Sequence, residues 1–69
     1  MLLSRTLLNT ATGSKFTLVV KADGKYWNAT LYSKVGGRLV DGTTFRREEI
    51  PTIHDAAEAA TRWSSLAPA

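Results

Sequence analysis

The chain has 69 residues, no cysteine and a net charge of +3, which limits it to one small domain, residues 1–69, and excludes disulfide scaffolds and thiolate metal sites. It contains no run of about 20 apolar residues, and Arg5 interrupts the apolar start, so we expect neither a membrane span nor a signal peptide. The lack of cysteine also fits a reducing compartment, and we expect a cytoplasmic protein.

The charges are distributed unevenly along the chain. Residues 1–47 contain eight Lys and Arg against two Asp, a balance of +6, whereas residues 48–69 contain one Arg against four Asp and Glu, a balance of −3. This asymmetry predicts a basic sheet followed by an acidic helix, and a basic sheet favours an anionic partner. The alternative is that the lysines only keep exposed strands soluble and discourage edge pairing.

The first segment, residues 2–8, is compatible with two structures. Leu3 and Leu7 would lie on one side of a strand, with Arg5 between them. The segment is therefore either an edge strand or a loosely docked arm, and the sequence leaves both open. Residues 9–14 are rich in Asn, Thr, Gly and Ser, and this composition predicts a loop.

A strand is expected over residues 15–21, where every second residue is apolar: Phe16, Leu18 and Val20. Asp23-Gly24 follows this strand, and Asp-Gly between two alternating runs is a strong hairpin signal. We therefore expect the next strand to pair antiparallel with this one.

The stretch 25–35 has the clearest two-sided pattern, and the predicted sheet is organised around it. Read with a period of two, its residues separate into two faces. The face that we expect to be buried carries Trp27, Ala29, Leu31 and Val35. The opposite face is polar, aromatic and basic, and it carries Tyr26, Asn28, Thr30, Tyr32 and Lys34. We expect both tyrosines to be exposed to solvent on the side away from the core.

The next turn is predicted at Gly36-Gly37, because glycine accepts the positive φ that tight hairpin turns require. A third strand is expected over residues 38–47. Asp41-Gly42 in its middle suggests a bulge, which would shift the side-chain alternation by one residue.

After Pro51 the apolar residues change to helical spacing. Thr52 is a good N-cap, and Asp55 follows at a spacing that resembles a capping box. We expect a helix from Ile53 to Ser65 whose apolar face packs on one side of the sheet.

These elements predict an α+β fold, a three- or four-stranded antiparallel sheet with one C-terminal helix packed on one face. The expected core joins alternate strand residues to one helix face, and its members are Phe16, Leu18, Val20, Trp27, Ala29, Leu31, Phe45, Ile53, Ala57, Ala60 and Trp63. A chain this short buries only about 60% of its unfolded surface, so a homodimer is an expected way of burying more.

The residues that catalysis or metal binding requires are not grouped in this sequence. His54 is the only histidine, and it falls in the first helical turn, where we expect an exposed surface residue. The serines have no neighbouring His or Lys in a recognisable nucleophile motif, and no spacing of His, Asp and Glu suits a metal ion. We therefore expect a non-enzymatic protein without a metal or another cofactor.

The polar face of the predicted sheet is the candidate binding site. It combines basic residues that suit phosphates, an Asn that suits adenine, and tyrosines that suit base stacking or phosphate contact. The candidate nucleic-acid-binding residues are Lys15, Lys21, Tyr26, Asn28, Thr30, Tyr32, Lys34 and Arg46. The competing explanation is that Tyr and Thr simply fit a pleated surface.

Three short motifs give the chain a family resemblance: Gly-Lys-Tyr-Trp-Asn-Ala at 24–29, Gly-Thr-Thr-Phe at 42–45 and Asp-Ala-Ala-Glu-Ala-Ala at 55–60. From residue 15 to residue 63 the chain resembles the three-stranded-sheet-plus-helix DNA-binding domains of plant ethylene-response factors and of phage tyrosine integrases at their arm-binding end. The resemblance implies a sheet that lies in the major groove, and the DNA-contacting positions would be Tyr26, Asn28, Thr30 and Arg46. The strand order is also similar to small antitoxin-like β-β-β-α domains and to single-strand-binding coactivator-like proteins, which dimerise through a helix.

A second function stays open on the sequence alone. The same face, or the edge of the sheet, would serve a protein partner if the chain were a small interaction or inhibitor protein of phage or plasmid type. Affinity for nucleic acid falls steeply with salt, with a slope of about −0.9 per phosphate contact on duplex DNA. A protein interface of ordinary composition lacks that dependence, so the salt response of binding separates the two functions.

Overall fold

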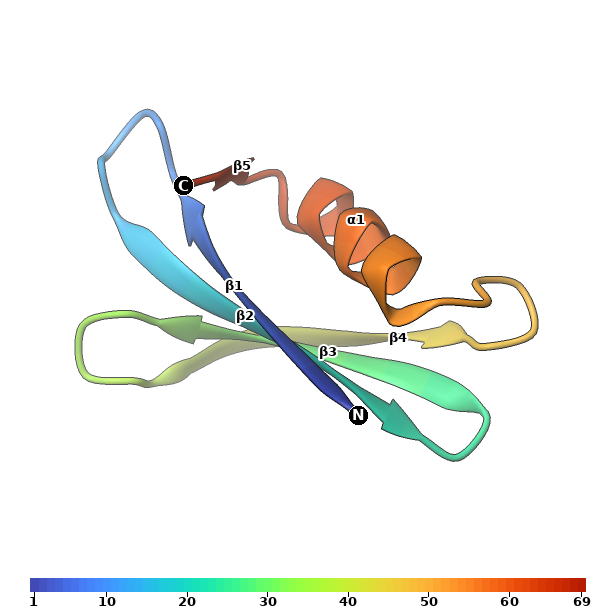
Figure 1. Ribbon diagram of the computed structural model, residues 1–69. Coiled ribbons are helices and arrows are strands. Elements are labelled where there is room, and N and C mark those ends of the chain that lie inside the picture. Colours follow the sequence, from blue (N-terminus) through green and yellow to red (C-terminus); the bar gives the residue numbers. More distant parts are fainter.

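Five strands form one antiparallel sheet in the computed structural model, which describes all 69 residues (Figure 1). The elements are β1 (Leu2–Leu8), β2 (Lys15–Asp23), β3 (Tyr26–Ser33), β4 (Leu39–Arg46), α1 (Ile53–Ser64) and the short β5 (Ala67–Pro68). The strand order across the sheet is β4-β3-β2-β1-β5, so the first four strands are neighbours both in sequence and in space. The predicted α+β fold, an antiparallel sheet with a C-terminal helix, is confirmed.

Helix α1 packs on one face of the sheet, over β1, β2 and β3, and leaves most of β4 uncovered (Figure 1). Its buried apolar residues are Ile53, Ala56, Ala57 and Ala60. Three of these side chains are single methyl groups, so the helix axis can lie close to the sheet. We call the face under α1 the covered face and the opposite face of the sheet the outer face.

The helix begins and ends with ordinary capping interactions. The Thr52 hydroxyl oxygen accepts a hydrogen bond from the backbone N–H of Asp55 at 3.1 Å, as the sequence predicts for an N-cap. At the other end Ser65 adopts a left-handed conformation with φ 62°, and its N–H donates to the Arg62 carbonyl. The helix therefore ends at Ser64, one residue earlier than the prediction.

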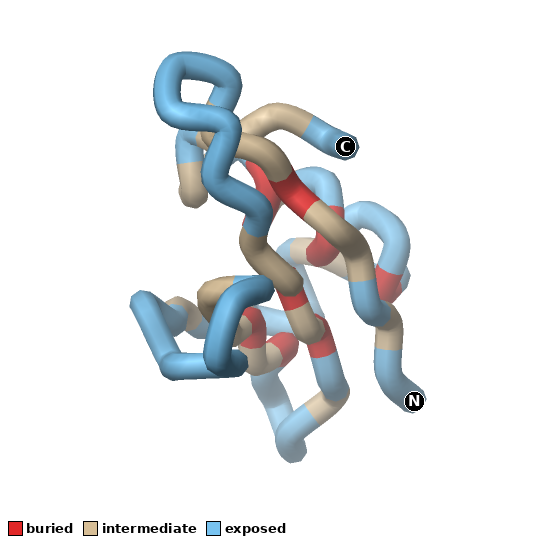
Figure 2. The backbone as a smooth tube through the Cα atoms, turned by 90° about the vertical axis from the view of Figure 1, so that its left-hand side faces the viewer, coloured by how far each residue is buried: buried red, intermediate tan, exposed pale blue.

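The core is a cluster of ten buried apolar residues between the covered face and α1. The sheet contributes Leu7, Leu18, Val20, Trp27, Ala29 and Leu31, and α1 contributes the four residues named above. Three predicted core residues, Phe16, Phe45 and Trp63, are only partly buried and pack around this cluster. Figure 2 shows that the buried positions lie within strands and helix, while the loops are exposed. Phe45 stays partly exposed because α1 does not extend over β4.

Strand β1 settles the alternative that the sequence left open for residues 2–8. It pairs with β2 from Leu2 to Leu8, and at its other side β5 pairs with its last two residues. The C-terminal end of β1 is therefore an interior strand rather than an edge or an arm. Leu7, which is absent from the predicted core, lies on the covered face of this strand and is fully buried.

One charged side chain lies on the covered face beneath α1. The Arg5 guanidinium donates to Glu58 Oε1 at 2.9 Å and to the Thr61 hydroxyl oxygen at 3.4 Å. The Arg5 side chain is 26% exposed and that of Glu58 is 58% exposed, so this ion pair lies at the rim of the core, where water still reaches it. It links β1 to α1 without placing an unpaired charge in the interior.

The β2–β3 hairpin has a two-residue loop, Gly24-Lys25, which confirms the predicted hairpin with the loop one residue later than Asp23-Gly24. Gly24 has φ 59°, the positive value that a type II′ turn requires at its first loop position.

The β3–β4 connection differs from the prediction, because the chain leaves the sheet at Ser33. The Ser33 N–H donates to the Arg38 carbonyl at 2.8 Å and closes a loop over residues 34–37, in which both glycines have positive φ. Val35 lies in this loop and is 88% exposed, so its predicted place in the core is wrong. The two-residue alternation that placed it there ends with the strand.

Strand β4 contains the predicted bulge, displaced by one residue. Leu31 pairs with Asp41 and Tyr32 pairs with Leu39, so Val40 is the extra residue on β4. The strand spans Leu39–Arg46 rather than the predicted 38–47.

Candidate nucleic-acid interface

The seven predicted site residues that belong to strands all lie on the outer face. They alternate in sequence with residues buried under α1, and the register pairs them only with one another and with other outer-face residues. Lys21 pairs with Asn28, and Asn28 pairs with Thr44 on β4. These residues are Lys15, Lys21, Tyr26, Asn28, Thr30, Tyr32 and Arg46.

The eighth predicted residue, Lys34, lies just beyond the end of β3. Its backbone N–H donates to the Lys15 carbonyl at 3.1 Å, so the two lysines are neighbours at one end of the outer face. Its position is therefore in a loop rather than in the strand that the sequence predicted.

The basic residues of the outer face form two groups instead of one. Lys15 and Lys34 lie at the end near the β3–β4 loop, whereas Lys21 and Arg46 lie near the other end, where Tyr26 pairs with Arg46. Lys15 and Lys21 are six residues apart on β2, a separation of about 20 Å at the rise of an extended strand. Asp23, which pairs with Tyr26, is the one carboxylate on this face.

The space between the two basic ends is neutral and rich in hydrogen-bonding groups. Asn28 on β3 pairs with Lys21 on β2 and with Thr44 on β4, and Thr30 pairs with Val19 on β2. Thr17 pairs with Tyr32 further along β3. The Thr30 hydroxyl donates to the Val19 carbonyl at 3.4 Å, whereas the Asn28 side chain makes no hydrogen bond within the protein. The middle of the face therefore offers an amide and hydroxyls to a ligand.

The two tyrosines differ in exposure. Tyr26 is 45% exposed at the Lys21–Arg46 end, as predicted. Tyr32 also lies on the outer face but is partly buried, between Thr17 and Leu39 on the neighbouring strands. Tyr26 is therefore the more accessible ring for stacking.

Apolar residues also reach the outer face. Leu39 is 60% exposed and Leu2 is 65% exposed, and Val40 at the bulge is 50% exposed. The facing of β4 was ambiguous in the sequence because the bulge position was unknown. Leu39 and Val40 lie on an edge strand, where they form an exposed apolar pair.

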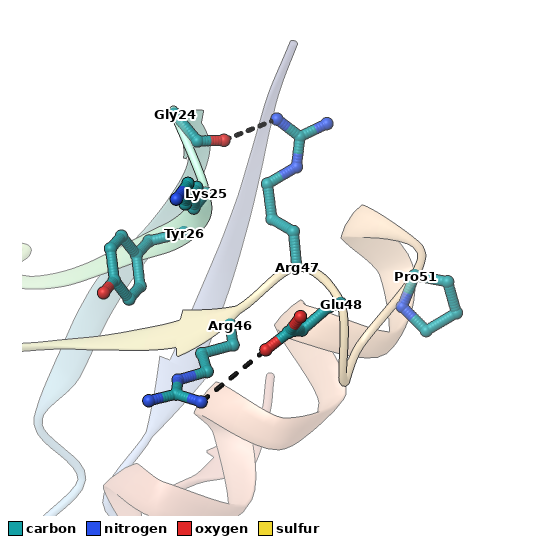
Figure 3. Close-up of a pocket in the computed structure, with 7 residues that line it drawn as sticks. All are labelled: Gly24, Lys25, Tyr26, Arg46, Arg47, Glu48 and Pro51. Atoms are coloured by element: carbon teal, nitrogen blue, oxygen red, sulfur yellow. Dashed lines mark hydrogen bonds and ion pairs between the residues drawn. The ribbon is translucent and has the colours of Figure 1, made fainter.

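A recess of about 760 Å³ opens at the Tyr26 end of the sheet, between the β2–β3 turn and the connection from β4 to α1 (Figure 3). Its lining residues are Gly24, Lys25, Tyr26, Arg46, Arg47, Glu48 and Pro51. Tyr26 and Arg46 are among the residues that the sequence pattern predicts for the binding site, whereas Lys25, Arg47 and Glu48 are not. The signal that could have found them is the hairpin itself, because it folds Gly24-Lys25 back against the end of β4.

Arg47 fixes one wall of this recess. Its guanidinium donates to the Gly24 carbonyl at 2.9 Å, and its backbone N–H donates to the Lys25 carbonyl at 2.9 Å. The guanidinium carbon also lies 4.8 Å from the centroid of the Trp27 ring, a cation–π contact. Trp27 in turn donates its indole N–H to the Ile50 carbonyl at 2.6 Å. The turn and the connection after β4 are therefore fixed to each other and to the core.

Arg46 and Arg47 leave the chain in opposite directions, as successive strand residues do (Figure 3). Arg46 points away from Arg47 and its Nη1 lies 3.6 Å from Glu48 Oε1. Both side chains of this pair are mostly exposed, at 63% and 76%, so the interaction is weak and easily exchanged.

The structure contains no group of three His, Asp or Glu side chains arranged to hold a metal ion. His54 is exposed in the first turn of α1, as expected. The helix is not long and apolar enough to cross a membrane. Comparisons of the chain with protein-family models, with curated proteins and with solved structures give no match.

Proposed function

We propose that this protein is a non-enzymatic, cytoplasmic nucleic-acid-binding module that uses the outer face of its sheet. The observation that carries the proposal is the layout of that face, a neutral hydrogen-bonding middle between two basic ends about 20 Å apart. Phosphate contacts position a protein on nucleic acid, while contacts to base edges read the sequence. The two basic ends suit the first task and the middle suits the second.

The ligand favoured by this layout is a duplex. The major groove of B-DNA is about 12 Å wide, and strands of a sheet can lie in it. The outer face would present β3 and the edge strand β4 to the groove. In this arrangement Asn28 would face base edges, where Asn suits adenine. The basic ends of the face would contact phosphates of the two strands.

A salt titration tests the proposal. Four basic residues that each contact one phosphate predict a loss of affinity of about 100-fold between 50 and 200 mM salt. The measurement is fluorescence anisotropy of a labelled mixed-sequence duplex. The triple variant Lys21→Ala, Lys34→Ala, Arg46→Ala should lose most of this binding and most of its salt dependence while keeping the wild-type circular dichroism spectrum. Arg62→Ala, which removes one positive charge from the exposed side of α1, is the control for loss of charge away from the outer face and should bind as wild type does.

Two results count against the proposal in different ways. If the wild type gives no signal with micromolar duplex at low salt, nucleic acid is not the partner. If the triple variant binds as well as the wild type, nucleic acid remains the partner but the outer face is not the site.

The second candidate function is binding of a protein partner, as in a small interaction or inhibitor protein of phage or plasmid type. One observation favours it, the exposed Leu39 and Val40 on the edge strand β4. Edge strands accept a further strand through their free backbone groups. The outward N–H of Gly42, however, already bonds to its neighbour Asp41 Oδ1 at 2.8 Å, which reduces the room for such pairing. This is why nucleic acid is preferred.

A further inference from the structure

We propose that the recess at the end of the sheet is a phosphate-binding site in which Lys25 and Arg46 hold the phosphate and Glu48 occupies Arg46 when the site is empty. The source of the phosphate is either the backbone of a bound nucleic acid or a small phosphorylated molecule. Where the phosphate belongs to a nucleic acid, this site rests on the function proposed above, and Lys25 adds a contact outside the predicted site.

The recess carries an excess of positive charge. Three basic residues, Lys25, Arg46 and Arg47, line the recess, and Glu48 is the only carboxylate in its lining. The recess is therefore net positive even with Glu48 in place, and it is partly open to solvent. Such a site attracts an anion before contact and holds it on contact.

The two proposed phosphate-binding residues are held in place relative to each other. Lys25 lies in a hairpin turn, where a side chain would ordinarily be mobile, but two hydrogen bonds from Arg47 tie this turn to the end of β4. The backbone positions of Lys25 and Arg46 are therefore fixed relative to each other before any ligand arrives. A fixed site costs less conformational entropy on binding than two independent side chains.

The side chains of Lys25 and Arg46 are available to a phosphate. Lys25 makes no ion pair, and Arg46 makes only the 3.6 Å contact with Glu48. A phosphate oxygen is a better partner for Arg46 than that exposed carboxylate, since guanidinium and phosphate form two parallel hydrogen bonds. Arg47 is different, because the Gly24 carbonyl and the Trp27 ring engage its guanidinium. It acts as a positioning residue.

The recess adjoins the outer face of the sheet. Tyr26 and Arg46 belong both to the outer face and to the lining of the recess. A nucleic-acid backbone that contacts the Lys21–Arg46 end of the face therefore reaches the recess without leaving the surface. The recess extends the basic end of the face around the edge of the sheet.

The sharpest test compares two variants that each replace a negatively charged Glu by uncharged Gln, at adjacent positions. Glu48→Gln removes the competing carboxylate, whereas Glu49→Gln removes a carboxylate that is exposed and outside the recess. Duplex affinity at low salt should rise about two- to fivefold for Glu48→Gln and change little for Glu49→Gln. An equal rise in duplex affinity for the two variants would show that only the net charge of the protein matters, and it would overturn the site.

Lys25→Ala measures the phosphate contact itself. It should reduce the slope of log affinity against log salt by about 0.9, the value of one contact on a duplex, whereas Arg62→Ala should leave the slope unchanged. If the wild type binds the duplex, Lys25→Ala leaves the slope unchanged and pyrophosphate causes no shifts at Lys25 and Arg46, the site is wrong while the proposed function stands.

Titration with inorganic pyrophosphate, followed by amide chemical shifts, identifies the other source. Shifts at Lys25 and Arg46 that are lost in Lys25→Ala support a phosphate site. If these shifts occur but the protein does not bind the duplex, its ligand is a small phosphorylated molecule. In that case the phosphate site stands and the proposed function is wrong. The absence of both pyrophosphate shifts and duplex binding would overturn the site and the proposed function together.

Discussion

Tyr26 and Trp27 are neighbours in the chain, yet they lie on opposite faces of the sheet, one exposed to solvent and one buried. Trp27 on the covered face is 2% exposed and donates its indole N–H to Ile50, while Tyr26 on the outer face is 45% exposed. The same alternation continues along β3, where Ala29 is buried and Asn28 is partly exposed. One strand thus contributes stability through one face and free hydrogen-bonding groups through the other. Substitutions on the two faces should therefore have separable effects on folding and on binding.

The largest effect is expected at Trp27. Trp27→Ala removes a buried ring, its hydrogen bond to Ile50 and the surface under Arg47, and should lower the free energy of unfolding by about 3–5 kcal/mol. Urea unfolding followed by circular dichroism measures this loss, and Trp27→Phe provides a milder variant if the alanine variant does not fold. Tyr26→Ala, one residue away, is the matched control on the other face. A similar loss of unfolding free energy in the two variants would contradict the assignment of stability to the covered face alone.

Leu7→Ala is expected to come next. Leu7 is fully buried between α1 and the sheet, so its truncation should cost about 2–4 kcal/mol. The control is Leu8→Ala on the outer face of the same strand, which is only partly buried. If both variants unfold at the wild-type urea concentration, β1 is not an integral part of the sheet.

A small effect is expected at Arg5, although it lies on the covered face. Because Glu58 in the ion pair is mostly exposed, replacing Arg5 by Met should change the free energy of unfolding by less than about 1 kcal/mol. Met retains most of the apolar stem that packs under α1. A loss as large as that of Leu7→Ala would show that the ion pair, rather than apolar contact, fastens β1 to the helix.

The smallest effect on stability is expected on the outer face. The triple variant Lys21→Ala, Lys34→Ala, Arg46→Ala should keep the wild-type free energy of unfolding within about 0.5 kcal/mol, since exposed surface substitutions away from special contacts are usually near neutral. Thermal unfolding monitored beside the binding assay gives this comparison. Loss of stability together with loss of binding would leave the role of the face in binding undefined.

Much of this separation is predictable from local patterns in the sequence. The alternation of Tyr26 to Tyr32 fixes both faces of β3, and Thr52 marks the start of the helix, because each signal depends on a residue and its immediate neighbours. The outer-face position of the strand residues in the candidate site follows from the same alternation. Their binding of nucleic acid stays a prediction.

The parts that escaped prediction depend on contacts between distant segments. Leu7 is buried because α1, from the other end of the chain, packs over β1. Val35 is exposed because the chain turns away at Ser33, and Lys25 enters a recess because the end of β4 folds against its hairpin. No pattern of apolar residues within one segment reports where another segment will lie.

The most direct measurement is the map of amide chemical-shift changes when a mixed-sequence duplex is added at low salt. If the outer face binds nucleic acid, the changes should concentrate at Lys21, Asn28, Thr30 and Arg46, with the exposed side of α1 unaffected. Changes confined to α1 or to the Leu39–Val40 edge, or no changes at micromolar duplex, would contradict the assignment of function to that face.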